Sequence, residues 1–486
     1  MPQDMSHTTS IRSGLSRRNL LASGVAAGAA AAMLGSGTGG QTAGAAVEAA
    51  HADSPDHSTG LPDTADLRKA LYARPLAPGL PGRDYIPVES PNSGTIPWKI
   101  VNGVKVFHLV AMEVWNEFCP GLKALCWGYN GMIHPVLEAV QGERVRIYVT
   151  NRLPEATTTH WHGVYVPCGM DGMAGLTQKA IPPGETYMYE FNLVDHGTKM
   201  FHSHFDEMTQ IGLGMTGLFI IHPRTPAPDR AVDRDFAIML HEWRIDPGAY
   251  RPNPLEMTDF NVFTMNAKSF PATHPLVVRT GQRVRIRLGN LGPMDHHPIH
   301  LHNYSFQIVA SDGGEYPRSA WQPATTVLVP VGTTRTVEFV ASNPGDWAMH
   351  CHMTHHAMTQ MGHNFPNMIG VKPGTLGHKM RKLLPDYMTM GQNGMGMTMG
   401  MPSIPNSTPM LGGKGPHGLI DMGGMFTILK VRDGITTYND PGWYQNPPGE
   451  LALNATAANM QRDGINPGQT PVPIPGPSSP AAKPEY

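Results

Sequence analysis

The chain has 486 residues, enough for two or three domains of ordinary size. Only 15% of its residues are charged and the formal net charge is -2, so neither a nucleic acid nor an acidic membrane surface is an expected partner. The 54 glycines and 46 prolines favour short strands joined by turns over long helices. The 24 histidines and 31 methionines are unusual, and both side chains bind metals.

The first residues indicate export from the cytoplasm. Segment 1–52 has the pattern of a twin-arginine signal, in which Arg17 and Arg18 precede a weakly apolar run rich in alanine and glycine. A disordered leader is the alternative. Small residues around Ala52 predict cleavage there, followed by an extended arm over 53–89. No later segment offers the ~20 apolar residues of a membrane span, so we expect a soluble periplasmic or extracellular protein.

Two parts of the chain repeat one another. Residues 142–147 recur as 281–286, and in both copies apolar and polar residues alternate as in half-buried strands. Each copy leads into one His-x-His pair and ends at a second pair. The repeats predict two all-β domains, over 90–225 and 236–375, with a linker over 223–235.

The tail over 376–486 is rich in glycine, proline and methionine. Alternation over 424–431 predicts one further strand. The methionines do not follow the spacing of a helix face, so a flexible tether for Cu(I) and a low-complexity linker without function both remain open. They are Met388, Met390, Met395, Met397, Met399, Met401, Met410, Met422 and Met425.

Of the four cysteines, Cys119 and Cys126 are close enough in sequence to pair, but the sequence leaves open whether they do. Cys351 has a different neighbourhood, with a histidine on either side. His356 follows it by five residues, Met361 follows by ten, and His297 precedes it. Two imidazoles, one thiolate and a weak axial thioether are the ligands of a trigonal blue-copper site, whereas a structural cysteine needs none of these neighbours.

Four His-x-His pairs occupy equivalent places in the two repeats. Residues i and i+2 of a strand face the same side, so each pair can present two imidazoles together. Eight imidazoles exceed the needs of a tetrahedral zinc and suit three copper ions. The pairs are His160 and His162, His202 and His204, His300 and His302, and His350 and His352.

These motifs resemble those of multicopper oxidases, the family of laccases, ascorbate oxidase and ceruloplasmin. The similarity covers about 90–375 and is carried by Thr159-His160-Trp161-His162-Gly163, His202-Ser203-His204, His297-Pro-Ile-His300-Leu-His302, and His350-Cys351-His352 with His356 and Met361. It implies two cupredoxin-like (Greek-key β-sandwich) domains, like those of the small two-domain laccase-like branch.

The resemblance also implies one type 1, one type 2 and two type 3 copper ions per chain. The type 1 ligands would be His297, Cys351 and His356, with Met361 axial; the type 2 ligands His160 and His300; the ligands of one type 3 ion His162, His202 and His352, and of the other His204, His302 and His350. Cys351, His350 and His352 would carry electrons between the sites. Asp171 resembles the family's proton donor, and a turn aspartate is the equal alternative. Because Ser203 stands where the second repeat has Cys351, the first domain is expected to lack a blue copper.

The expected reaction is laccase-like: a small phenolic or aromatic donor is oxidised and O2 is reduced to water. Cu(I) or Mn(II) are alternative donors, and a copper-storage protein without turnover is an alternative of another class. A copper nitrite reductase is disfavoured because its cluster position needs fewer histidines. The two-domain branch further implies a homotrimer with clusters at the subunit interfaces.

Overall fold

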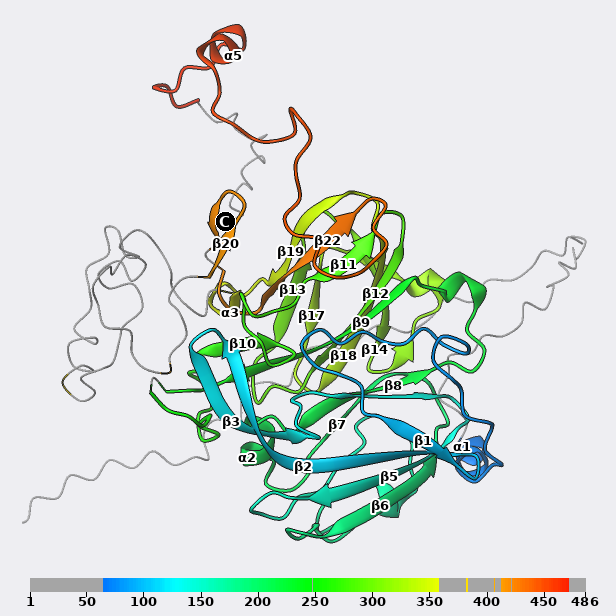
Figure 1. Ribbon diagram of the computed structural model, residues 1–486. Coiled ribbons are helices and arrows are strands. Elements are labelled where there is room, and N and C mark those ends of the chain that lie inside the picture. Colours follow the sequence, from blue (N-terminus) through cyan, green and yellow to red (C-terminus); the bar gives the residue numbers. More distant parts are fainter. Residues whose placement is uncertain are drawn as a thin grey trace, which may run out of the picture. The chain divides into compact units, whose positions relative to one another are not determined.

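A computed structural model describes residues 64–246, 248–357, 382, 406, 412–420 and 422–471. The export signal, Met361 and most of the Met-rich segment lie outside these residues. Strands dominate what is described, which confirms the prediction of an all-β fold (Figure 1). Within these ranges, no helix is both long and apolar enough to cross a bilayer.

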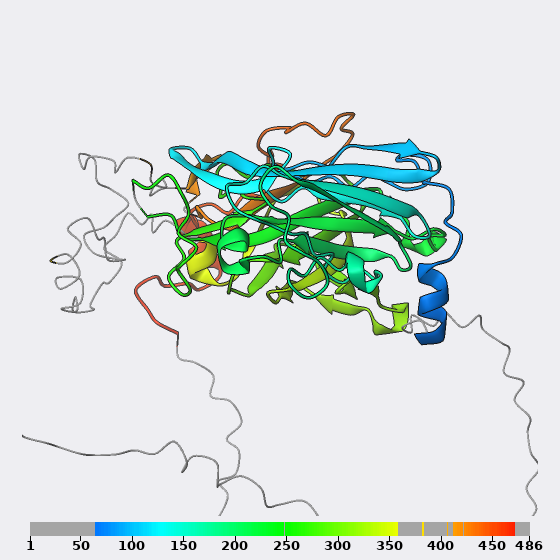
Figure 2. The same ribbon diagram turned by 90° about the horizontal axis from the view of Figure 1, so that it is seen from below.

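The first repeat forms two sheets. One has the order β1-β2-β5-β6, with β3 also paired to β2, and the other has the order β4-β8-β7. In both views β2 and β3 lie side by side as long cyan strands (Figure 1 and Figure 2). The strands are β1 (Trp98–Val101), β2 (Val104–Cys119), β3 (Leu122–Tyr129), β4 (Val136–Val140), β5 (Arg144–Asn151), β6 (Thr186–Asn192), β7 (Gly197–His202) and β8 (Thr216–His222).

The second repeat forms a larger pair of sheets, of orders β10-β9-β12-β18-β14-β15, with β16 paired to β14, and β11-β22-β19-β13-β17. Residues 426–432 of the tail form β22 and insert between β11 and β19, so this sheet needs a strand from beyond residue 375. The strands are β9 (Arg234–Trp243), β10 (Val262–Met265), β11 (Leu276–Arg279), β12 (Arg283–Asn290), β13 (His297–Leu301), β14 (Phe306–Ser311), β15 (Gly314–Glu315), β16 (Gln322–Ala324), β17 (Thr326–Val329), β18 (Thr333–Val340), β19 (Gly345–Cys351) and β22 (Phe426–Arg432).

The helices of the described residues are short: α1 precedes the first strand, α5 follows the last, and the others lie between strands. A further hairpin of two short strands lies in the tail. These elements are α1 (Thr64–Leu71), η1 (Cys168–Met170), α2 (Glu207–Gly212), η2 (Pro228–Arg230), η3 (Arg318–Ala320), α3 (Thr354–Ala357), β20 (Gly413–Gly415), β21 (Gly418–Ile420) and α5 (Ala457–Arg462).

Alternation explains why the repeated sequence forms strands. In β5 the side chains of Val145, Ile147 and Val149 are fully buried, while the residues between them are partly exposed. The equivalent β12 begins with the same pattern. Each of these strands follows a glycine in the left-handed region, Gly142 at φ 83° and Gly281 at φ 87°, where a side chain would strain the turn. The repeated sequence therefore forms the same local structure, a turn at glycine followed by a strand, in both copies.

The two repeats meet through a buried ion-pair network. The guanidinium of Arg287 donates two hydrogen bonds of 2.8 Å to the carboxylate of Asp235 and one of 2.9 Å to Oγ1 of Thr198 in β7. Arg285 contacts the same carboxylate and also Glu338. Burial works against the charge on Asp235, but the two arginines outweigh it and lower the pKa of its carboxyl. The Arg287 side chain thus joins β12 to β9 through Asp235 and to β7 through Thr198.

Replacing one partner of this network should destabilise the fold. Asp235→Asn leaves two buried guanidinium groups undercompensated, and we expect a loss of about 3–5 kcal/mol at pH 7, measured by denaturant unfolding. Because the pKa of Asp235 is lower in the folded chain, its contribution is present above the unfolded pKa of about 4 and is lost as pH falls through the folded pKa. The difference between wild type and variant should therefore shrink in acid.

Asp229→Asn is the matched control, since Asp229 pairs with Arg318 at the surface, where both side chains are at least half exposed. The free energy of unfolding of Asp229→Asn should fall by less than about 1 kcal/mol. Equal losses of unfolding free energy in Asp235→Asn and Asp229→Asn would contradict a special role for the buried Asp235–Arg287 pair.

Candidate metal centres

Cys351 ends β19 with its sulfur inside the second repeat. Its Sγ lies 3.5 Å from Nδ1 of His356 and 3.9 Å from Nδ1 of His297, and the two Nδ1 atoms are 3.1 Å apart. All three residues are buried. His297 begins β13, which pairs with β19, and His356 lies on α3 directly after β19. Met361 lies outside the described residues. Three metal-binding atoms thus converge from three elements.

The chemistry of this donor set fits a metal ion. Burial raises the pKa of the Cys351 thiol to about 12 and, with the neighbouring His297 and His355, lowers the pKa of His356 to about 3. Burial therefore favours the uncharged forms of the Cys351 thiol and the His356 ring. Two imidazole nitrogens that face each other beside a thiol are suited to a soft cation, whose binding would release the thiol proton.

Carboxylates and an aromatic ring surround the trio. Oε2 of Glu242 in β9 lies 3.2 Å from Nε2 of His297. Oδ2 of Asp295 lies 3.5 Å from Nε2 of His356, and the Phe263 ring stacks on the His356 ring at 4.2 Å between centroids. Burial and the nearby Glu242 raise the pKa of Asp295. Motif spacing does not identify these residues, because they come from other strands or lack a fixed offset from Cys351.

A second histidine group lies on the outer face of the same strands. His300 in β13 is directly opposite His350 in β19, and His302 and His352 follow these strands. Ring centroids of neighbouring members are 5.0–5.7 Å apart, and Nε2 of His302 lies 3.2 Å from Nε2 of His350. His302 and His352 are exposed to solvent. Alternation thus sends the sulfur of Cys351 inward and the imidazole of His350 outward.

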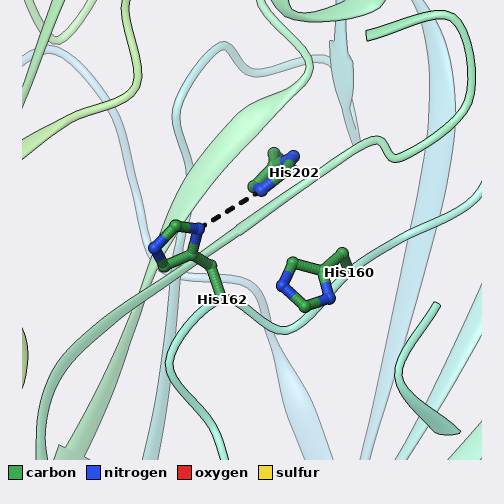
Figure 3. Close-up of side chains that lie close together, drawn as sticks. All are labelled: His160, His162 and His202. Atoms are coloured by element: carbon green, nitrogen blue, oxygen red, sulfur yellow. Dashed lines mark hydrogen bonds between the residues drawn. The ribbon is translucent and has the colours of Figure 1, made fainter. Parts of the chain in front are cut away.

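The first repeat carries an equivalent group. His160 pairs with His202 across a β-bridge, as His300 pairs with His350. Figure 3 shows His160, His162 and His202 gathered together, with Nδ1 of His162 3.4 Å from Nε2 of His202. His204 completes the group, with its ring 5.5 Å from His160 and 5.9 Å from His202. Burial lowers the pKa of His202 to about 3, so its ring is neutral.

Backbone carbonyls orient four of these imidazoles in the same way. Nδ1 of His160 lies 2.7 Å from the Asp171 carbonyl, and Nδ1 of His300 lies 2.7 Å from the Thr325 carbonyl. The Nδ1 atoms of His202 and His350 lie 2.8 and 2.9 Å from the carbonyl of the next residue. A carbonyl only accepts, so each Nδ1 donates its proton there, and Nε2 is the nitrogen that each ring presents to the other imidazoles of its group.

Acidic groups also lie beside the first group. Oδ1 of Asp171 is 3.5 Å from Nδ1 of His160, so the aspartate named from its Gly-Met-Asp-Gly turn does lie against a histidine. Oε1 of Glu207 is 3.1 Å from Nε2 of His204, a contact that the motifs do not predict. Both carboxylates thus lie beside an imidazole nitrogen of this group.

The two histidine groups remain apart in the described part of the chain. Every close ring pair among these eight residues joins members of one group, either 160–204 or 300–352. Each group contains four of the eight imidazoles that belong to the His-x-His pairs.

Hydrogen-bonding side chains fill the place in the first repeat that corresponds to the sulfur site. Oε1 of Gln210 accepts hydrogen bonds from Oγ of Ser203 at 2.5 Å and from Oγ1 of Thr157 at 2.7 Å. Ser203 replaces Cys351, and Thr157 precedes His160 as His297 precedes His300, by three residues. Gln210 replaces His356.

The backbone supports the last correspondence. Ser203 and Gln210 exchange hydrogen bonds with Met215 in the same way that Cys351 and His356 do with Met425. One backbone frame therefore holds a hydrogen-bonded polar trio in the first repeat and the trio of His297, Cys351 and His356 in the second. The remaining cysteines carry no bond to each other: Cys119, Cys126 and Cys168 are free thiols.

Comparisons with known proteins follow the two repeats. Family models described as multicopper oxidase match residues 113–226 and 246–370. Copper resistance protein A of Escherichia coli is 28% identical over 232 residues, 38% of this chain and 38% of that protein. Laccase-20 of Oryza sativa subsp. japonica is 26% identical over 299 residues, 57% of this chain and 48% of that protein.

A solved structure of blue copper oxidase from Nitrosomonas europaea is similar at 30% identity, with a TM-score of 0.48, over 52% of this chain and 80% of that one. The chain spans less than half the length of the two curated relatives, copper resistance protein A and laccase-20. Two consecutive family matches, one on each repeat, agree with the four copper motifs. The chain belongs to the multicopper oxidase family.

Proposed function

We propose that this protein is an exported, copper-dependent oxidase that takes single electrons from a small phenolic or aromatic donor and reduces O2 to water. The observation that carries the proposal is the placement of Cys351 between two imidazoles, while its neighbours His350 and His352 belong to a second histidine group. The relatives named as laccases and as a blue copper oxidase support this reaction class.

In this proposal, His297, Cys351 and His356, with Met361, hold a type 1 copper. His160 and His300 hold the type 2 copper. One type 3 ion is bound by His162, His202 and His352, and the other by His204, His302 and His350. Bound copper would supply reversible one-electron chemistry, through which four electrons taken singly from the donor, together with four protons, would convert one O2 to two water molecules.

The chain's own contribution is connection and proton supply. Strand β19 links the sulfur to the outer imidazoles through a few covalent bonds, because Cys351 shares peptide bonds with both His350 and His352. Carbonyl acceptors hold the Nδ1 protons and aim the Nε2 atoms. In this proposal the Asp171 carboxyl group donates protons to the oxygen being reduced, and its position 3.5 Å from Nδ1 of His160 supports that role.

We further propose two cupredoxin-like domains, over 90–225 and over 236–375 with β22 added from the tail. They would assemble as a homotrimer in which each cluster forms between neighbouring chains. The separation of the two histidine groups within one chain supports this, as does the exposure of His302 and His352. A closed ring of head-to-tail contacts lets every first-repeat group meet a second-repeat group. The arginine pair near the amino terminus supports twin-arginine export to the periplasm or beyond.

Cu(I) is the second candidate donor. The tail's methionine spacing favours it, and relatives are named copper resistance protein A. A Met-rich tether would concentrate Cu(I) near the oxidase.

Removal of the sulfur tests electron entry. Cys351→Ser should lose one copper per chain, all blue absorption and at least about 100-fold in oxygen consumption, because no other thiolate can serve the site. Copper analysis, absorption spectra and an oxygen electrode measure these quantities. Cys168→Ser, at an exposed free thiol, should change none of them. Oxidase activity retained in Cys351→Ser would reject the proposed entry point.

Mixing of variants tests the shared cluster. His162→Ala and His302→Ala should each be inactive alone, because each breaks every cluster. Co-expressed in equal amounts, they should recover about a quarter of wild-type activity, since one interface in four pairs an intact first repeat with an intact second repeat. Co-expression of His302→Ala with His350→Ala is the control and should recover nothing. No recovery in the first mixture would place the cluster within one chain.

A deletion distinguishes the two donors. Without residues 388–410, oxidation of Cu(I) at low concentration should fall about tenfold if the methionines collect the ion, while turnover of a phenol should not change. A glycine-serine segment of equal length is the control for spacing. Equal Cu(I) turnover in wild type and deletion would leave the phenol as the supported donor.

A further inference from the structure

Glu242 is a buried carboxylate that the proposed oxygen chemistry does not require. It lies in β9, and both its side chain and that of His297 are 0% exposed. Oε2 faces Nε2 of His297 at 3.2 Å, while Oε1 accepts hydrogen bonds from the backbone N–H groups of Met294 at 2.6 Å and Asp295 at 2.8 Å. Two backbone N–H groups and one imidazole nitrogen thus face the two oxygens of this carboxylate.

The surrounding backbone is built to admit this carboxylate. A Cβ atom at Gly292 would lie 1.8 Å from Oε2 of Glu242, so any side chain at that position would displace the carboxylate. Directly across the β9–β10 pair from Glu242 is Phe263, whose ring stacks on His356. One pair of facing residues in the larger sheet therefore contacts both imidazoles of the sulfur site.

We propose that Glu242 is a positioning residue that lowers the reduction potential of the copper held by His297 and Cys351. An imidazole whose Nε2–H donates to a carboxylate becomes a stronger donor at Nδ1, the atom that faces the sulfur. A negative charge in unexposed surroundings also stabilises Cu(II) more than Cu(I). Asp295 beside His356 has a side chain that is 32% exposed, so water screens its charge more strongly.

The inference rests on the proposed function, because it needs a copper at Cys351. It goes further by naming the group that sets how readily the site accepts an electron. The charge comes from a strand of the opposite sheet, 55 residues before His297 in sequence, so the local copper motif does not contain it.

The test is a spectroelectrochemical titration of the blue band in copper-loaded full-length wild type and Glu242→Gln. Glutamine keeps the shape and an acceptor oxygen but removes the charge. The midpoint should shift to higher potential, with copper content and the blue band retained. Glu242→Asp, which keeps the charge with a shorter reach, should shift less in the same direction, and it provides the measurement if the glutamine variant does not fold.

Glu138→Gln is the matched control. Glu138 is also buried, its Oε2 lies 2.9 Å from Nε2 of His222, and it accepts a backbone N–H from Val88, but it lies in the first repeat. The midpoint potential of the blue band in Glu138→Gln should equal that of wild type. An unchanged or lower midpoint in Glu242→Gln would overturn the inference, as would an equal rise in Glu138→Gln. A wild-type protein without a blue band would instead reject the proposed function itself.

Discussion

The alternation of side chains along β19 is the constraint on which the rest of the molecule depends. Because consecutive residues face opposite sides, one strand end can place a sulfur inside the sandwich and imidazoles outside it. The inner trio needs walls on every side, and two sheets, a short helix and the buried Glu242 supply them. The outer histidines need an open face, and β13 and β19 leave His302 and His352 in solvent. Both demands are met without any unusual backbone at Cys351.

Much of this arrangement is readable in the sequence because the signals are local and repeated. The alternation around Val145 and Val284 predicts strands, and His-x-His pairs at matching offsets predict groups of imidazoles on a shared face. The closeness of Cys351 and His356 follows from spacing that is typical of one loop after one strand. These are properties of neighbouring residues, which chain order preserves.

What the sequence does not reveal depends on contacts between distant segments. Glu242, Phe263 and Asp295 lie around His297 and His356 because particular strands pair and pack, and their residue types are ordinary for strands and turns. Strand β22 comes from a segment far beyond the second repeat, yet it lies between β11 and β19. Hydrogen bonds from Nδ1 atoms to carbonyls depend on ring orientation, which spacing alone does not specify.

The polar trio of Thr157, Ser203 and Gln210 has a consequence for how the two repeats came to differ in chemistry. Its frame matches the one around Cys351 but closes through hydrogen bonds among three side chains that carry no formal charge. The same backbone hydrogen bonds thus enclose two different interiors. In the first repeat the side chains bond one another, and in the second they bring a sulfur and two imidazole nitrogens together.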